Sequence, residues 1–167
     1  MMFNTEYVFK GKHANFVSKL AENKGLGIFK RNMDVYLLAP IIGKYYNRTA
    51  TEDKEATNTT KIFADVIIKE QIKLEFIYRV IMLLHGNESS EEKIKRAFHD
   101  DNKEDRMKEN MEIFNLYVLG GVEILYEKLL EDAVDQDDFL DNLYQLVDEF
   151  NNDFAETEDF DIYELAK

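Results

Sequence analysis

Residues 59–85 read TTKIFADVIIKEQIKLEFIYRVIMLLH and carry the strongest periodic pattern in the chain. Apolar side chains recur there at three- and four-residue steps, which places them on one face of an α-helix; they are Phe63, Val66, Ile67, Leu74, Ile77, Ile81 and Leu84. A second apolar row widens this face and comprises Ile68, Ile72, Phe76 and Val80. The pattern predicts one helix from Thr59 to His85, capped by Thr59 or Thr60 and ended by Gly86. Its wide apolar surface indicates a central helix with neighbours on several sides.

The rest of the chain divides into further helices. They are predicted at residues 13–23, 28–46, 89–98, 105–131 and 136–154. Ser89 followed by Glu92 has the spacing of a capping box, which marks the start of the fourth helix. Between and around the helices, we expect a lead-in over residues 1–12 that is extended at residues 7–9, an exposed loop over residues 47–58, and an acidic C-terminal tail over residues 155–167.

Two places inside the predicted helices go against helix propensity. Pro40 lacks a backbone N–H and its ring clashes with the preceding turn, so we expect a kink or a break near Leu38 and Ala39. Gly120 and Gly121 each cost roughly 1 kcal/mol relative to alanine in the middle of a helix. Either the helix bends at these glycines or a neighbouring helix comes close to them.

The fold class follows from the scarcity of turn residues. The chain has one proline and seven glycines in 167 residues, too few for the frequent turns of a sheet protein. We predict an all-α fold, an irregular bundle of five to seven helices that forms a single domain over residues 1–167. The long helices at residues 59–85 and 105–131 are expected to pack antiparallel at its centre, bridged by the helix at residues 89–98.

The composition narrows the setting in which the protein works. Because the chain has no cysteine, it has no disulfide framework, no thiolate nucleophile and no cysteine-based zinc site. Residues 1–6 lack the basic and then apolar pattern of a signal peptide, and the longest nearly uncharged apolar stretch, residues 35–43, is about half a membrane span. We expect a cytoplasmic protein without a membrane partner.

Charge is distributed unevenly along the chain. Residues 1–48 hold eight Lys or Arg against three Asp or Glu, a net charge of +5. Residues 49–130 hold twelve against seventeen, a net charge of −5, and residues 131–167 hold one against fourteen, a net charge of −13. The sum is the −13 of the whole chain.

This gradient has three interpretations. In the first, the basic N-terminal helices pack near the acidic C-terminal helix. In the second, the early cations form a patch that meets another protein or a nucleic-acid backbone; the candidate binding residues are Lys10, Lys12, Lys19, Lys24, Lys30, Arg31, Lys44 and Arg48. In the third, the acidic C-terminal third is itself a working surface, which mimics a nucleic-acid backbone or docks on a basic partner.

Motifs that would indicate an enzyme are weak. His99 and Asp100 form the His-Asp dipeptide found in metal-dependent phosphohydrolases, with His85 before it and Asp132 or Asp135 after it as further ligands. A role for the pair in ending the fourth helix explains it more simply. Long helices also carry four glutamates without the histidine partners of a di-iron site, so we interpret them as solvated; they are Glu70, Glu75, Glu123 and Glu127. We therefore predict no catalytic residue, no bound metal and no cofactor.

Residues 28–43 read IFKRNMDVYLLAPIIG and form an unusual segment. Arg31 and Asp34 stand three residues apart and can pair on one helix face. The segment resembles the helices of small accessory proteins in bacterial DNA-sulfur-modification and phage-defence operons. The resemblance covers this one helix, carries no diagnostic motif and implies no residue roles.

Taken together, these features favour a non-enzymatic accessory or interaction subunit of a bacterial intracellular assembly, in a defence or DNA-related system. Its expected partners are other protein subunits or a second copy of the chain. The first alternative is a nucleic-acid-binding component that uses the basic N-terminal helices. The second alternative is a metal-dependent hydrolase that uses His99 and Asp100.

Overall fold

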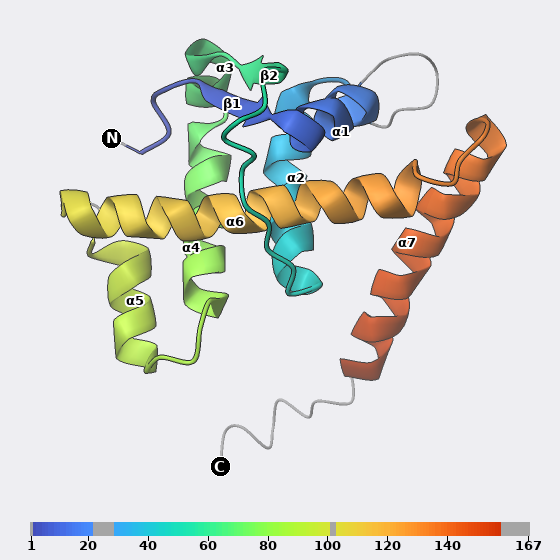
Figure 1. Ribbon diagram of the computed structural model, residues 1–167. Coiled ribbons are helices and arrows are strands. Elements are labelled where there is room, and N and C mark those ends of the chain that lie inside the picture. Colours follow the sequence, from blue (N-terminus) through green and yellow to red (C-terminus); the bar gives the residue numbers. More distant parts are fainter. Residues whose placement is uncertain (1, 22–28, 101–102, 158–167) are drawn as a thin grey trace. The chain divides into compact units, whose positions relative to one another are not determined.

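The computed structural model describes residues 2–21, 29–100 and 103–157, and Figure 1 shows how their elements are arranged. These residues form two short strands and seven helices, in the order β1 (Tyr7–Lys10), α1 (Gly11–Ala21), α2 (Asn32–Tyr45), β2 (Thr59–Ile62), α3 (Ala64–Lys69), α4 (Gln71–Leu84), α5 (Ser90–Phe98), α6 (Glu104–Leu129) and α7 (Gln136–Thr157). The predicted all-α, multi-helix fold is confirmed, with a small two-stranded sheet added.

The chain divides into two compact units, Met1–Tyr126 and Glu127–Lys167. Helix α6 begins in the first unit and ends in the second. The single domain expected over residues 1–167 stays a prediction.

The stretch at residues 59–85 is not the single helix that its pattern predicted. Residues Thr59–Ile62 form β2, which pairs antiparallel with β1 so that Tyr7 lies opposite Ile62. Thr59 and Thr60 are β-branched and favour extended backbone. The pairing also satisfies backbone groups that the first turn of a helix would leave open. The extended segment predicted at residues 7–9 is confirmed as part of β1.

The helical remainder of this stretch is divided at Glu70, where φ is −104° and ψ is 10°. Part of the apolar surface that was expected to contact neighbours faces outward instead. Ile72 is 86% exposed, Phe76 is 69% exposed and Ile68 is 49% exposed. Helices α2 and α5 pack against α4, and they bury the face of α4 that carries Leu74 and other core residues. Three members of the second apolar row are left exposed, and its fourth member, Val80, is half-buried.

Helices α2 and α6 touch through glycines. A Cβ atom on Gly121 would collide with the carbonyl group of Ala39, and one on Gly43 would collide with the carbonyl group of Tyr117. A neighbouring helix therefore comes close to Gly121, which confirms the second of the two explanations for the paired glycines. Helix α2 continues through Pro40, so the expected break is wrong. Close packing on α6 supports the turn in which the proline removes a hydrogen bond.

The segment after α2 is also tied to α6. A Cβ atom on Gly120 would meet the carbonyl group of Arg48, and the backbone N–H of Ala50 donates to the carbonyl oxygen of Leu116 at 3.0 Å. Residues 47–58 are thus irregular, as predicted, but their first part lies along α6 instead of standing free in solvent.

Aromatic rings fill the core of the first unit. Phe114 of α6 lies 6.0 Å from Tyr78 of α4, 6.3 Å from Tyr36 of α2 and 5.6 Å from Phe3, measured between ring centroids. These edge and tilted contacts are the arrangements that aromatic pairs prefer. In Figure 1, α6 crosses α2 and α4, whereas antiparallel packing of two long helices was expected. Helix α6 meets α2 and α4 at the aromatic contacts, and it also meets α2 at the glycine contacts. These contacts determine that α6 crosses the other two helices.

Helix α5 agrees closely with its prediction. The hydroxyl group of Ser89 accepts a hydrogen bond from the backbone N–H of Glu92 at 3.3 Å, as the capping spacing predicts. The helix bridges α4 and α6 because Arg79 of α4 donates to the carbonyl oxygen of Ala97 and Asn110 of α6 donates to that of Arg96.

The second unit consists of the end of α6, a short connection and α7. Phe139 and Leu146 are buried, and Lys128 pairs with Glu149 at 2.8 Å. The carboxylate of Asp135 accepts from two backbone N–H groups in the first turn of α7. Helix α7 runs to Thr157, three residues beyond its predicted end and into the predicted tail. Within the described ranges, no helix is long and apolar enough to cross a membrane.

Candidate partner-binding surfaces

Two of the eight predicted binding cations converge on one buried carboxylate. Lys12 at the start of α1 pairs with Glu123 of α6 at 2.8 Å, and Arg48 after α2 pairs with it at 2.9 Å. His13 adds a third contact, Nε2 to Oε1 of Glu123, at 3.0 Å. The Glu123 side chain is only 7% exposed. These contacts join α1, α6 and the segment after α2.

The other predicted cations that the structure describes have different partners. Lys10 pairs with Glu52 at 3.3 Å. Arg31 pairs with Asp34 at 2.6 Å, as its spacing predicted, and also with Glu70. The carboxylates that face these cations all belong to the first 126 residues.

Two lysines lie over tyrosine rings, Lys19 over Tyr126 at 5.3 Å and Lys44 over Tyr117 at 5.4 Å. Lys30 is exposed, and Lys24 lies outside the described residues. The structure thus brings Lys12 and Arg48 together, and the other described cations of the set are distributed over several elements. A binding role for the eight residues stays a prediction.

Glu123 is the buried charge that the sequence interpretation missed, because it was taken as solvated. Its immediate neighbours in sequence, Val122 and Ile124, are both buried, and a charge inside such an apolar run is the signal that could have identified it. Burial acts to raise the pKa of Glu123, but hydrogen bonds from Lys12 and Arg48 more than offset this, so the pKa lies below its usual 4.5. Glu123 is therefore ionised at neutral pH.

His13 is fully buried beside this carboxylate. Burial lowers its pKa below the usual 6.5, although Glu123 acts in the opposite direction. The neutral ring donates from Nε2 to the carboxylate. Burial also lowers the pKa of His85, whose Nδ1 lies 3.1 Å from the hydroxyl oxygen of Tyr117.

These two histidines predict a pH-dependent stability. The unfolded chain takes up protons near pH 6.5, whereas folded His13 and His85 have lowered pKa values and take them up only at lower pH, so protons favour the unfolded state. The free energy of unfolding should be constant above about pH 7.5 and should fall as the pH drops from about 7 to 5.5, by at most about 1.4 kcal/mol per pH unit for each histidine. Urea denaturation across this range measures it. His13→Gln should flatten the profile and the double change with His85→Gln should flatten it further; an unchanged slope in the double variant would contradict the assignment.

His99 and Asp100, the two residues considered as metal ligands, both lie where one helix ends and the next begins. Asp100 is 1% exposed and pairs with Lys103 at 2.9 Å, which places it at the junction before α6. His99 is exposed and ends α5. No group of three His, Asp or Glu side chains suitable for a metal ion is found among the residues that the structure describes.

Helix α7 presents an apolar row to solvent. Leu140, Tyr144 and Val147 are 49%, 72% and 48% exposed. Their i, i+4, i+7 spacing places them on one face. Exposed carboxylates stand three or four positions from members of this row and therefore flank it; they are Asp137, Asp141 and Asp148. We call Leu140, Tyr144 and Val147 the α7 row.

Comparison with known proteins gives a family for nearly the whole chain. The model of a family described as DNA sulphur modification system-associated protein 4 matches residues 10–165. No curated protein and no solved structure matches the chain. The family description agrees with the expectation of an accessory protein in a DNA-related system.

Proposed function

We propose a function for this chain, which belongs to the family described as DNA sulphur modification system-associated protein 4. It is a non-enzymatic accessory subunit that docks on another protein of such a system. The contact is made by α7, whose apolar row enters a groove on the partner.

The observation that supports this proposal is the exposed α7 row. Soluble proteins seldom leave an aromatic side chain and two aliphatic ones uncovered on one helix face without a reason. Anchors at i, i+4 and i+7 are the pattern by which an amphipathic helix binds a hydrophobic groove. Tyr144 stands at the middle of the row, and tyrosine is among the residues that contribute most to such interfaces.

Charge indicates the chemistry of the partner. Residues 131–167 carry a net charge of −13, and three carboxylates flank the α7 row directly. A groove with an apolar floor and a rim of lysine or arginine would complement both features. The acidic flank would also disfavour binding to acidic proteins, so it adds specificity.

Titration of the purified chain against each of the other proteins of a DNA sulphur modification system tests the proposal. We expect one of them to bind, with an affinity that falls as salt is added, because the rim contacts are screened. Val147→Ser combined with Tyr144→Ser should weaken binding by tenfold or more, which corresponds to about 1.4 kcal/mol or more. Both side chains are exposed, so the variant should fold normally.

Val134→Ser is the matched control. Val134 is 89% exposed and precedes α7, outside the row, so this change should leave binding intact. Binding that is equal in the row variant and the control would refute docking through α7. Salt-sensitive binding of duplex DNA that is lost on charge reversal at Lys30 and Arg31 would favour the nucleic-acid alternative, which stays a prediction.

A further inference from the structure

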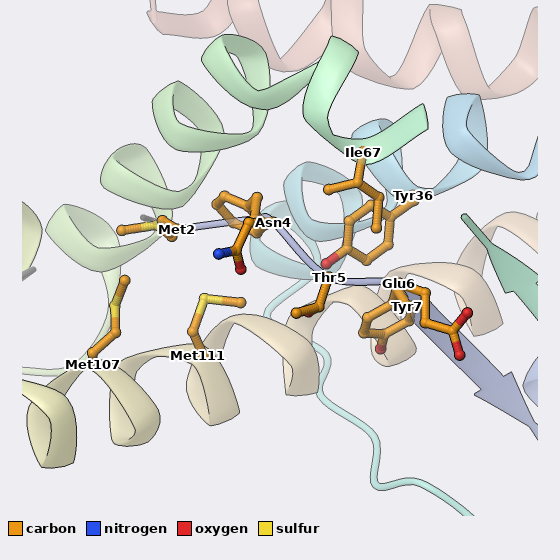
Figure 2. A pocket seen from close by; sticks show the side chains of 10 residues that line it. Met2, Asn4, Thr5, Glu6, Tyr7, Tyr36, Ile67, Met107 and Met111 are labelled. Carbon is orange, nitrogen blue, oxygen red and sulfur yellow. The ribbon is translucent and has the colours of Figure 1, made fainter. Parts of the chain in front are cut away.

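A pocket of about 230 Å³ lies beside the N-terminal segment, within the first unit (Figure 2). The segment leading into β1 crosses the pocket, Ile67 of α3 and Tyr36 of α2 line one part of it, and Met107 and Met111 of α6 line another. The pocket is far from α7 in sequence and shares no residue with the α7 row.

The N-terminal segment is held in place by specific contacts. The side chain of Gln71 donates to the carbonyl oxygen of Met2 at 2.7 Å. Phe3 adopts a φ of 56°, in the left-handed region, while its ring packs against Tyr78 and Phe114 of the core. These contacts anchor Met2 and Phe3, so this wall of the pocket is preformed.

A buried hydroxyl group faces the pocket. Tyr36 is 1% exposed, and Figure 2 shows its hydroxyl directed toward Thr5 within the pocket. No described residue forms a hydrogen bond with this hydroxyl. Because burial raises the pKa of Tyr36 well above 10, the hydroxyl stays neutral and can both donate and accept. A molecule bound in the pocket can therefore form a hydrogen bond with this hydroxyl, which would favour its binding.

The opposite part of the pocket is lined by thioethers from two segments, those of Met2, Met107 and Met111. Methionine side chains are flexible and polarisable, and their sulfur atoms make favourable contacts with aromatic rings. They give this part of the pocket an apolar wall, which favours an uncharged ligand.

We propose that this pocket binds a phenol ring, with the ring against the methionine side chains and its hydroxyl hydrogen-bonded to Tyr36. The volume fits, since an apolar cavity of about 150 Å³ holds benzene and this pocket is larger. The same chemistry can come from a small free phenol or from a tyrosine side chain of another protein. The proposal does not depend on docking through α7.

NMR of the full chain, labelled with ¹³C at the methionine methyl groups and carrying any tag at the C-terminus, tests this proposal. The probe is p-cresol, the side-chain analogue of tyrosine. We expect the signals of Met2, Met107 and Met111 to shift in a saturable manner. Met33 and Met82 are buried elsewhere in the core and serve as internal controls that should not shift.

Toluene has the same ring and methyl group without the hydroxyl, which isolates the hydrogen bond. Tyr36→Phe should weaken p-cresol binding about tenfold and leave toluene binding unchanged, since the hydroxyl it removes has no partner among the described residues. Met107→Trp should fill the pocket and abolish binding of both probes. Shifts with N-acetyl-tyrosine amide as well as p-cresol would identify a protein side chain as the source, and shifts with p-cresol alone would identify a free phenol.

Three results would overturn the proposal. In the first, p-cresol moves no pocket methionine up to the limit of its solubility. In the second, it moves Met33 and Met82 equally, which indicates non-specific binding. In the third, Tyr36→Phe binds p-cresol as tightly as the unaltered chain, so that the hydroxyl takes no part.

Discussion

Gly121→Val should lower the free energy of unfolding by about 3 kcal/mol or more, at or above the upper end of what overpacking in a core usually costs. The new side chain would meet the carbonyl group of Ala39, and backbone cannot move aside as a flexible side chain can. The crossing of α2 and α6 would have to open, and the neighbouring contact at Gly43 would be lost with it. Urea denaturation followed by circular dichroism measures the change.

Glu112→Val is the control for this experiment. It places the same β-branched side chain in the same helix, at an exposed position. Its cost should be limited to the difference in helix propensity, less than about 0.7 kcal/mol. If Gly121→Val is no more destabilising than Glu112→Val, the two helices do not touch at this glycine.

Glu123→Gln should cost about 3 kcal/mol, the lower end of the range for breaking a buried ion pair. The change keeps the size of the side chain and removes its charge. Lys12 and Arg48 lose their shared partner, but their side chains are 59% and 37% exposed and water can solvate them. The amide oxygen of glutamine can still accept the hydrogen bond from buried His13, but the amide NH2 group then takes the place of the oxygen that pairs with Arg48.

Glu112→Gln is the matched control because it makes the same change on the exposed side of α6, and it should alter the stability by less than about 0.5 kcal/mol. The loss in Glu123→Gln should also diminish in acid, where the carboxylate of the unaltered chain becomes protonated. Equal stability of the two variants would show that the cluster around Glu123 does not hold α1 and α6 together.

The sequence predicted correctly those features that depend on residues close together in the chain. The hydroxyl cap at Ser89, the pair of Arg31 with Asp34 and the helical periodicity over most of the chain all act within a few residues. The glycine pair at residues 120 and 121 likewise signalled either a bend or a close neighbour, and the neighbour is α2.

Contacts between distant segments could not be predicted in this way. Thr59 and Thr60 extend the helical pattern when read alone, yet they form a strand because Tyr7–Lys10 is available to pair with them. Ile72 and Phe76 are apolar at helical spacing, and only the positions of α2 and α5 determine that they stay exposed. Apolarity alone does not distinguish a buried row from an uncovered one.

For the candidate sites too, local patterns could be predicted and contacts between distant segments could not. One of the three interpretations of the charge gradient makes the acidic C-terminal third a working surface, and the α7 row lies within that third. The pairing of Lys10 with Glu52 and of Lys12 and Arg48 with Glu123 was not foreseen, since these carboxylates are distant from the cations in sequence or were interpreted as solvated. The pocket beside Tyr36 is lined by the N-terminal segment, α2, α3 and α6. Because its lining residues come from four separate segments, no motif in the sequence indicates it.

Photo-cross-linking from position 144 tests docking through α7 most directly. Tyr144 is replaced by a photoreactive benzoyl-phenylalanine in cells that produce a complete DNA sulphur modification system, and the irradiated adducts are identified by mass spectrometry. We expect a covalent adduct with one protein of that system, and none when the same probe stands at Val134. No adduct from position 144, an adduct with nucleic acid, or the same adduct from both positions would contradict docking through this helix.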